Sequence, residues 1–364
     1  MTYDYLIVGA GFAGCVLAER LASQCDKKIL LIDRRSHIGG NAFDSTNEHG
    51  IRIHHYGPHL FHTNSSEVFS YLSQFTEWHP YEHRVLASVN GILVPMPVNR
   101  TTINRLLGYH FSTEEEVRAF LEQERECFAE IINSEEFVLS KVGRRLYELL
   151  YRGYTKKHWG CEPAALSPSV CGRLPVRMNE DDRYFDDRYQ AMPREGYTAM
   201  FKRMTAQAGI DVELNTAFAD VPSGAFNEVI YTGPIDEFFG FEYGRLPYRS
   251  LRFEFETVDA ERVQPVAQLN YPNEFDYTRI TEFKHITGQT SSKTTIAREY
   301  SAEAGEPYYP VPNPENARLY DRYAKAARHL NHVYFAGRLA AYRYYNMDQV
   351  VAHSLSTFNR MAHR

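Results

Sequence analysis

The first forty residues alternate between apolar runs and a glycine-rich segment. Tyr3–Val8 is an apolar run of strand length, and a second apolar run, Lys28–Asp33, ends in an acidic residue. Between them lie the motif Gly9-x-Gly11-x-x-Gly14 and an Ala/Leu-rich segment of helical length. A strand, a glycine-rich turn, a helix and a second strand in this order predict a dinucleotide-binding βαβ unit.

Helical periodicity dominates residues 100–170. Residues 112–133 open with the capping-box pair Ser112 and Glu115. One face of this predicted helix carries Val117, Phe120, Leu121, Phe128 and Ile131. A second helix is predicted over Glu136–Gly153, with an inward face of Val138, Val142, Leu146, Leu149 and Leu150. This part of the chain is therefore expected to form a helical domain.

Strand patterns return in the second half of the chain. Leu251–Val258 alternates apolar and charged residues, which is typical of a half-buried strand. Thr294–Tyr300 and the segment around Asn270 are strand-like as well, so we expect an antiparallel sheet over residues 245–300.

Two later segments are predicted to rejoin the nucleotide-binding domain. Val229–Gly233 and Val333–Gly337 are short strands that end in glycine. A helix follows at Asp348–Met361, with an inward face of Val350, Val351, Leu355, Phe358 and Met361. A glycine at the end of a strand admits a pyrophosphate, and the following helix N-terminus faces the cofactor.

The first glycine motif has a defined chemistry. Gly9 makes the tight turn, Gly11 lets the backbone approach a pyrophosphate, and Gly14 lets the helix pack on the strand. Asp33 lies where a carboxylate accepts hydrogen bonds from the adenosine ribose. The continuation Arg34-Arg35-x-x-x-Gly39-Gly40-Asn41 resembles the extension of FAD-binding members of this fold. FAD is therefore favoured over NAD.

The predicted fold class is α/β, with a discontinuous Rossmann-like FAD-binding domain that carries an inserted helical domain and an antiparallel β-sheet domain. We expect the FAD-binding domain at residues 1–77, 193–240 and 329–364. The helical domain covers 98–173 and has a mobile lid loop near 168–175. The sheet domain covers 78–97, 174–192 and 241–328.

Composition narrows the possible partners. The chain has 364 residues, 43% hydrophobic content and a net charge of −6, so it can bury a large core and offers no basic field for nucleic acid or an anionic membrane. Its five cysteines are scattered, which predicts free thiols in a reducing cytoplasm. A first strand at residue 3 leaves no room for a signal peptide, and no apolar stretch of about 18 residues is present. We expect a cytoplasmic protein.

Further motifs extend over nearly the whole chain. They are Gly57-Pro-His59-Leu-Phe-His62-Thr, Gly153-Tyr154-Thr-Lys-Lys-His-Trp159-Gly, Arg173-Leu-Pro-Val-Arg177, Tyr184-Phe-x-Asp-Arg188-Tyr-Gln, Tyr231-Thr-Gly-Pro-Ile-Asp236, Tyr248-Arg249-Ser-Leu, Glu306-Pro-Tyr308-Tyr309-Pro-Val and Gly337-Arg338-Leu-x-x-Tyr-x-Tyr344-Tyr345. In this order, the chain resembles the bacterial UDP-galactopyranose mutase family from end to end.

The resemblance implies an isomerase that interconverts UDP-galactopyranose and UDP-galactofuranose without net redox change. In the family mechanism, N5 of reduced FAD attacks the anomeric carbon, UDP leaves, and the covalent flavin–sugar adduct opens and recloses before UDP returns. The resemblance also implies a homodimer and a role in cell-wall polysaccharide biosynthesis. The alternatives are a mutase for UDP-N-acetylgalactosamine or a deoxy-hexose nucleotide, and an amine-oxidase-like flavoprotein oxidase.

The resemblance also implies the substrate site. Arg173, the family's lid arginine, and Arg249 are expected to grip the diphosphate, and His62 to assist proton movement. Tyr154 corresponds to the residue that stacks on uracil and Trp159 to the one beside the ribose and sugar. The remaining expected contacts are the hydroxyls of Tyr184, Tyr309 and Tyr344, a third arginine, Arg279, and the polar side chains His83 and Asn270.

The expected cofactor site is larger. It comprises Gly9, Gly11, Phe12, Gly14, Asp33, Arg34, Gly40, Asn41, His59, Leu60, Phe218, Gly337, Arg338, Asn346, Met347, Asp348, Gln349 and Val350. Asp33 replaces a glutamate of many members, His83 an asparagine of some, and Asn346 an aspartate of some; the last two bear on which hexose is preferred. No metal is expected, because the neighbouring histidines lack carboxylates and the family uses none.

Overall fold

The computed structural model describes residues 2–362. Its nucleotide-binding part is built on a five-stranded sheet in the order β10-β2-β1-β11-β17, in which every neighbouring pair is parallel. The strands are β1 (Tyr3–Val8), β2 (Ile29–Asp33), β10 (Ile210–Leu214), β11 (Phe226–Tyr231) and β17 (Val333–Phe335). The sequence predicted four of these strands, and the structure confirms them.

The two faces of this sheet are covered differently. Ile7 and Leu31 belong to the core formed with three helices, α1 (Phe12–Cys25), α7 (Tyr197–Thr205) and α12 (Met347–Ala362). Leu6 and Ile32 alternate with them and pack against Phe218 on the other face. This alternation explains the continuous apolar runs, because parallel strands are buried on both faces. The predicted last helix is confirmed, with Val350, Val351, Leu355 and Phe358 buried.

A second, seven-stranded sheet has the order β16-β12-β15-β14-β13-β7-β8. Its strands are β7 (Val85–Val89), β8 (Ile92–Met96), β12 (Tyr248–Val258), β13 (Gln268–Asn270), β14 (Arg279–Glu282), β15 (Thr294–Ala302) and β16 (Tyr309–Pro310). Its neighbouring strands are antiparallel except for β13 and β7, which run parallel. The predicted strands within residues 245–300 are therefore present, and an earlier hairpin extends their sheet.

The helical part differs from the predicted pair of helices. Its elements are α3 (Arg100–Leu107), α4 (Glu114–Glu124), α5 (Ser134–Leu146), a π-helical turn (Tyr147–Arg152) and α6 (Gly153–Trp159). The predicted 112–133 helix ends at Glu124, and Phe128 and Ile131 lie beyond it. Its cap is Thr113 with Glu116, one residue later than predicted, because the Thr113 hydroxyl accepts the Glu116 N–H and the Glu116 carboxylate accepts the Thr113 N–H.

A glycine bends the second predicted helix. Gly143 has φ +73° and ψ 177°, and a Cβ there would lie 2.2 Å from the carbonyl oxygen of Glu124. Only glycine fits this crossing of α4 and α5. The inward face is nevertheless as predicted, with Val138, Val142, Leu146 and Leu150 buried in one core with β7 and β8.

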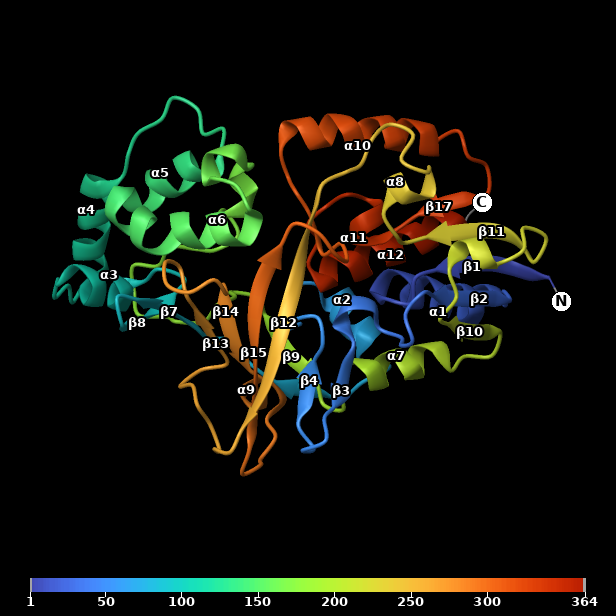
Figure 1. Ribbon diagram of the computed structural model, residues 1–364, viewed down its shortest axis with the longest axis horizontal. Coiled ribbons are helices and arrows are strands. Elements are labelled where there is room, and N and C mark those ends of the chain that lie inside the picture. The colour runs from blue at the N-terminus through green and yellow to red at the C-terminus, as the bar shows by residue number, and fades with distance from the viewer. Residues whose placement is uncertain (1, 363–364) are drawn as a thin grey trace.

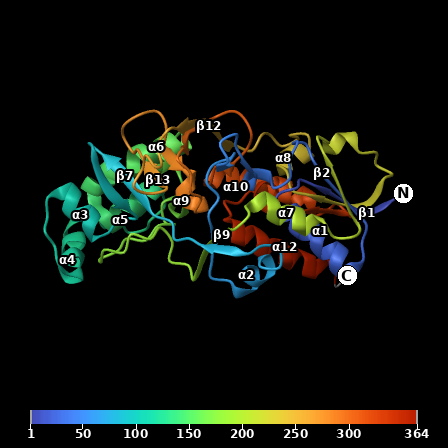
Figure 2. The ribbon, with the colours of Figure 1, turned by 90° about the horizontal axis from the view of Figure 1, so that it is seen from below.

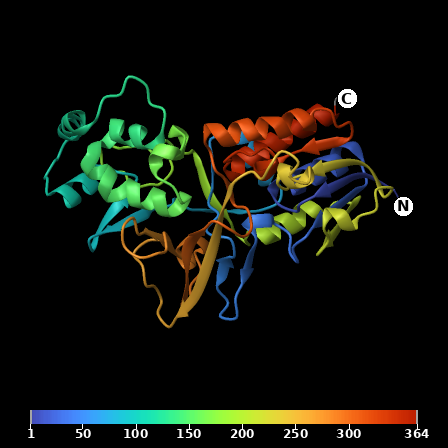
Figure 3. The same cartoon turned by 45° about the horizontal axis from the view of Figure 1, so that its top comes forward.

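The figures show an elongated molecule with the helical part at one end and the parallel sheet at the other (Figures 1 and 2). The seven-stranded sheet lies between them, and its long strand β12 begins beside the nucleotide-binding part and runs away from it (Figure 3). Smaller elements connect these parts: β3 (Asp44–Thr46), β4 (Arg52–His54), β5 (Phe61–Thr63), β6 (Trp78–Pro80), β9 (Tyr189–Pro193), α2 (Ser66–Leu72), α8 (Ile235–Phe238), α9 (Phe283–Thr287), α10 (Pro314–Ala327) and α11 (Gly337–Ala340).

One lysine fastens the helical part to the sheet. The Lys157 ammonium on α6 donates to the carbonyl oxygens of Glu274, Phe275 and Tyr277 at 2.9, 3.0 and 3.2 Å, and to that of Tyr271. These carbonyls belong to the loop that follows β13. The preceding residue, Lys156, is exposed and pairs with Glu162 at the surface.

We expect Lys157→Met to lower the free energy of unfolding by roughly 1–3 kcal/mol, because four carbonyls lose their donor. Lys156→Met is the matched control and should change stability by less than about 0.5 kcal/mol. Urea denaturation followed by circular dichroism measures both. Equal stabilities of the two variants would contradict a fastening role for Lys157.

Candidate active site

Two adjoining cavities lie between the nucleotide-binding part and the other two parts. The larger has a volume of about 1100 Å³ and the smaller about 260 Å³. His59, Arg338 and Met347 line both of them. A ligand that fills the smaller cavity therefore reaches the larger one at these three residues.

Most of the predicted cofactor residues line the smaller cavity. These are Gly9, Gly11, Phe12, Asp33, Arg34, Gly40, Asn41, His59, Phe218, Gly337, Arg338, Met347 and Val350. Leu60, Asn346, Asp348 and Gln349 line the larger cavity instead. Gly14 lines neither cavity, because it lies where α1 packs against the end of β1. A Cβ on Gly14 would lie 1.9 Å from the carbonyl oxygen of Gly9.

Glycine backbones form the narrow part of the smaller cavity. Gly9 has φ +105°, and a Cβ on it would lie 2.1 Å from the Thr232 hydroxyl oxygen. A Cβ on Gly40 would lie 3.0 Å from the Cα of Gly11. Gly11 is the N-cap of α1, and no side chain caps that helix. The free N–H groups at this helix start suit a pyrophosphate.

Asp33 is fixed at the end of β2. Its carboxylate oxygens accept the Ala10 N–H and the Arg35 N–H, both at 2.9 Å, and the residue is 8% exposed. Arg34 forms an ion pair with Glu306 at 2.6 Å, and Arg35 pairs with the same carboxylate at 3.2 Å. Two segments far apart in sequence thus close the cavity beside Asp33. The glycine cradle and the placed carboxylate fit a dinucleotide such as FAD.

Aromatic side chains form one wall of the larger cavity. Tyr154 and His158 lie one turn apart on α6 and stack with ring centroids 6.0 Å apart and planes 6° apart. Trp159 meets Tyr344 edge-on at 5.6 Å, and Tyr344 meets Tyr309 at 5.1 Å. Burial raises the pKa of Tyr154 and Tyr309, so both phenols keep their protons at neutral pH and remain hydrogen-bond donors.

Arginines supply the positive charge of this cavity. Arg279 on β14 pairs with the buried Glu299 at 2.8 Å and lies opposite Asn270 in the sheet register. Burial opposes its charge, but the Glu299 carboxylate outweighs that effect and holds the pKa of Arg279 well above its ordinary value. Arg173 is exposed on the loop after α6; its guanidinium lies 4.1 Å from the Tyr344 ring centroid and donates to Asn346.

Arg249 is not where the sequence prediction requires it. It lines neither cavity, and only 7% of it is exposed. Its guanidinium donates hydrogen bonds to the Ser301 hydroxyl at 2.8 Å and to the His158 carbonyl oxygen at 3.3 Å. A Cβ on Gly160 would lie 2.6 Å from its guanidinium. In this structure Arg249 supports the C-terminal end of α6 through its contacts with His158, Gly160 and Ser301.

Four histidines line the larger cavity: His59, His62, His83 and His158. Burial lowers the pKa of His59, His83 and His158 to about 3, so these three are neutral at pH 7. His62 is different, because its Nδ1 lies 2.8 Å from a carboxylate oxygen of Asp187. Tyr184 also lines this cavity, with its ring 5.5 Å from that of His83.

Sequence reasoning missed several lining residues. His158 had a signal, since it lies four residues after Tyr154 on the same helix and therefore on the same face. Gln268 had one too, because it lies two residues before Asn270 on β13 and donates to its side chain at 2.9 Å. Asp187 lies within the motif that runs from Tyr184 to Gln190, but the motif does not show its contact with His62, because only the pairing of β5 with β9 brings the two together.

Residues 2–362 contain neither a cluster of metal-binding side chains nor a membrane-spanning helix. No group of three or more His, Cys, Asp or Glu side chains there is placed to hold a metal ion. No helix in that range is long and apolar enough to cross a bilayer.

The fold and the site define a flavoenzyme whose dinucleotide cavity opens into a second cavity rich in arginine and tyrosine. The family model for UDP-galactopyranose mutase matches residues 149–344, and one for an NAD(P)-binding Rossmann-like domain matches residues 7–75. A probable UDP-galactopyranose mutase of Klebsiella pneumoniae is 39% identical over 97% of this chain and 93% of its own length.

Two further comparisons also match nucleotide-sugar mutases. A dTDP-fucopyranose mutase of Escherichia coli is 35% identical, over 96% of each chain. The crystal structure of a reduced UDP-galactopyranose mutase superposes with a TM-score of 0.82 at 17% identity, covering 100% of this chain and 94% of that one. The chain belongs to the UDP-galactopyranose mutase family. It is an isomerase, and its cofactor is FAD.

We expect Gly11→Val to weaken FAD binding without unfolding the protein. Gly11 has φ −85°, which valine adopts, but the added side chain would enter the passage beside Gly40. FAD affinity should fall at least about 10-fold, which is about 1.4 kcal/mol. Absorbance near the flavin maximum and titration of the apoprotein with FAD measure the loss. Gly224→Val is the control, since nothing lies within 4 Å of a Cβ there; full flavin content in Gly11→Val would contradict the assignment.

Proposed function

We propose that this isomerase interconverts UDP-galactopyranose and UDP-galactofuranose without net redox change, with FAD in its reduced state. One observation carries the proposal: the cofactor cavity opens, at His59, Arg338 and Met347, into a cavity with four arginines and several tyrosines. Such a cavity suits a nucleoside diphosphate sugar whose reacting carbon faces the flavin. The near full-length similarity to the Klebsiella protein supports the same reaction.

Reduced FAD supplies, when bound, the nucleophile that takes the sugar from UDP. The chain must stabilise the departing diphosphate, whose charge grows as the bond to the anomeric carbon breaks. Arg279 is held rigidly for this task by Glu299, and Arg173 can reach the same anion from the loop after α6. Tyr184, Tyr309 and Tyr344 add hydroxyl groups around it.

The remaining lining residues orient the two ends of the substrate. We assign uracil to Tyr154, whose ring already stacks parallel to His158, because a base stacks well on flat aromatic rings. Trp159 lies between Tyr154, at the uracil end, and Tyr344. We therefore assign the ribose and the sugar to the part of the cavity beside Trp159. His83 and Asn270 are assigned to the hexose, because both are buried polar residues on the cavity wall.

The loop that carries Arg173 is proposed to act as a lid. Arg173 reaches the C-terminal segment through Tyr344 and Asn346, so this loop crosses the cavity near the cofactor. A closed loop excludes water and keeps UDP beside the sugar until it is needed again. An arginine on the lid couples closure to the charge of the diphosphate.

The lid assignment predicts that Arg173→Ala lowers kcat/KM for the nucleotide sugar about 10- to 100-fold, because a charge-assisted contact is worth roughly 1.5–3 kcal/mol. Arg173→Lys should keep part of the activity. Arg125→Ala is the control, since Arg125 is exposed on the helical part and lines neither cavity. An Arg173→Ala variant with unchanged steady-state kinetics would rule out the diphosphate contact.

The reaction itself is tested anaerobically. Protein with bound FAD, reduced by dithionite, should convert UDP-galactofuranose into UDP-galactopyranose, as resolved by chromatography, and the oxidised protein should not. The E. coli relative makes a dTDP-fucopyranose substrate the second candidate. A higher kcat/KM for the dTDP-deoxy sugar would transfer the proposal to that substrate, and oxygen consumption with amines in place of either reaction would identify an oxidase.

We also propose a cytoplasmic homodimer that supplies the furanose for cell-wall polysaccharide. The family resemblance supports these three points. Light scattering coupled to size exclusion, at micromolar concentration, gives the mass of the particle; a mass near that of one 42.1 kDa chain would contradict the dimer.

A further inference from the structure

We propose that Asp187 positions His62 and that the two form a proton-transferring pair at the sugar end of the larger cavity. The inference rests on the proposed sugar isomerisation. His62 lies on β5, opposite Gln190 of β9, and Asp187 lies on the loop that leads into β9. The pairing of these two strands therefore brings together two residues that lie 125 positions apart in sequence.

The imidazole of His62 is held on two sides. Its Nδ1 lies 2.8 Å from one carboxylate oxygen of Asp187, and the other carboxylate oxygen accepts the Asn64 amide N–H at 2.8 Å. The Phe185 ring stacks on the imidazole at 3.7 Å with planes 13° apart. The Asp187 carboxylate can only accept a hydrogen bond in this contact, so Nδ1 carries the hydrogen and Nε2 is left as an acceptor.

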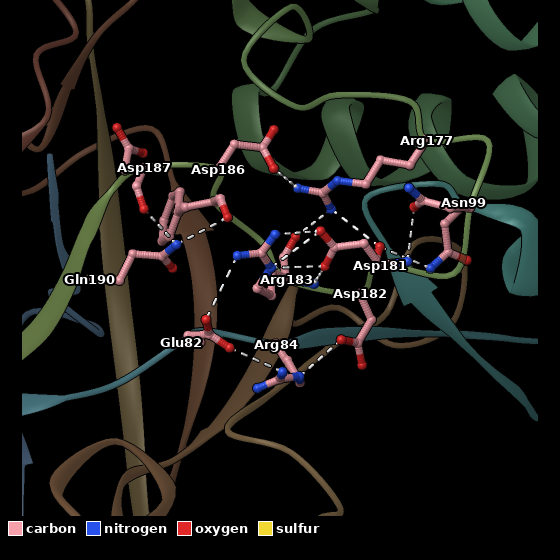
Figure 4. Close-up of polar contacts among 12 residues, drawn as sticks. Glu82, Arg84, Asn99, Arg177, Asp181, Asp182, Arg183, Asp186, Asp187 and Gln190 are labelled. Carbon is pink, nitrogen blue, oxygen red and sulfur yellow. Dashed lines mark hydrogen bonds and ion pairs between the residues drawn. The ribbon is translucent and has the colours of Figure 1, made fainter. Parts of the chain in front are cut away.

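The loop that carries Asp187 is itself rigid. Figure 4 shows the charged network that supports it, in which Arg183 pairs with Asp181 at 2.7 Å and Arg177 pairs with Asp186 beside Asp187. The Gln190 side chain donates to the Asp187 carbonyl oxygen at 3.0 Å. The carboxylate is thus fixed by its own backbone as well as by its two partners.

The pair differs from the other cavity histidines. His59 has its Nδ1 on the Gly57 carbonyl and His83 has its Nδ1 on the Tyr81 hydroxyl; His59 is half-buried, His83 is buried, and both are neutral. Within residues 2–362 a carboxylate contacts the ring of only one of the four cavity histidines, His62. No described side chain or backbone group hydrogen-bonds its Nε2. A carboxylate behind one nitrogen and a free nitrogen on the other side is the arrangement of a general base.

The isomerisation needs such a group. Opening of the pyranose ring breaks the bond between C1 and O5, and O5 takes up a proton. Closure of the furanose ring forms the bond from O4 to C1, and O4 loses a proton. His62 gives a proton to O5 as the pyranose opens and takes one from O4 through Nε2 as the furanose closes, so the imidazole ends each cycle with the proton it began with. Asp187 stabilises the imidazolium that is present before opening and after closure, and its contact with Nδ1–H leaves Nε2 free as the base between the two transfers.

The first test compares Asp187→Asn with Asp182→Asn, which changes the same side chain at the exposed ion pair with Arg84. We expect Asp187→Asn to lower kcat about 10- to 100-fold, with KM and FAD content within 2-fold of wild type, because it disturbs only the proton transfer. Asp182→Asn should keep wild-type kinetics. An Asp187→Asn kcat equal to that of the control would overturn the proposal.

A second test reads the imidazole directly and needs no turnover. In the ¹⁵N spectrum of the holoprotein, the His62 signals, assigned by their loss in His62→Gln, should show a protonated Nδ1 and an unprotonated Nε2, and Asp187→Asn should mix the two tautomers. An unchanged tautomer would overturn the pairing. A wild-type protein inactive on nucleotide sugars would contradict the proposed function, while this spectrum still decides whether Asp187 orients His62.

A double variant covers the case in which Asp187→Asn loosens the loop. If Asp187 acts through His62, adding Asp187→Asn to His62→Gln should cost no further activity. A multiplicative loss in the double variant would show that Asp187 acts by another route and would overturn the proposal.

Discussion

The close packing around Gly9 is the constraint on which the remaining structure depends. Gly9 ends β1 with its N–H on the Ile32 carbonyl at 2.8 Å, and α1 approaches so closely that Gly14 has no room for a Cβ. The end of β11 touches the same point through Thr232, and the start of α11 at Gly337 lies beside Ala13. Four segments from three parts of the sequence therefore meet around Gly9. This packing leaves the start of α1 free for a pyrophosphate, and the second cavity lies beyond it.

Charge in the larger cavity follows from burial. Neutral imidazoles and protonated phenols line the walls, because a buried group avoids charge unless a partner stabilises it. Arg279 keeps its charge because Glu299 lies beside it, and Arg173 reaches the cavity from an exposed position on the loop. The cavity therefore offers a few localised positive groups in a chain that is acidic overall, and the ligand they suit is an anion of defined shape.

Sequence patterns located the cofactor site better than the substrate site. The glycines, Asp33 and the last helix lie within contiguous motifs whose geometry is local, so their neighbours in space could be predicted. The substrate site joins side chains from α6, β13, β14 and the 344–349 segment, and a motif does not show which way a side chain points. Arg249 illustrates the difference: it lies in a matching motif, but it turns behind α6 and bonds Ser301.

The sequence by itself determined the parallel sheet, the glycine cradle, the choice of FAD and the family, because these depend on periodicity and on residues close together in the chain. Only the tertiary structure decided that the 112–133 helix stops at Glu124, that Arg279 and not Arg249 faces the cavity, and that Asp187 meets His62. The physical reason is common to all three: each depends on the packing of segments distant in sequence, and side-chain direction follows from that packing.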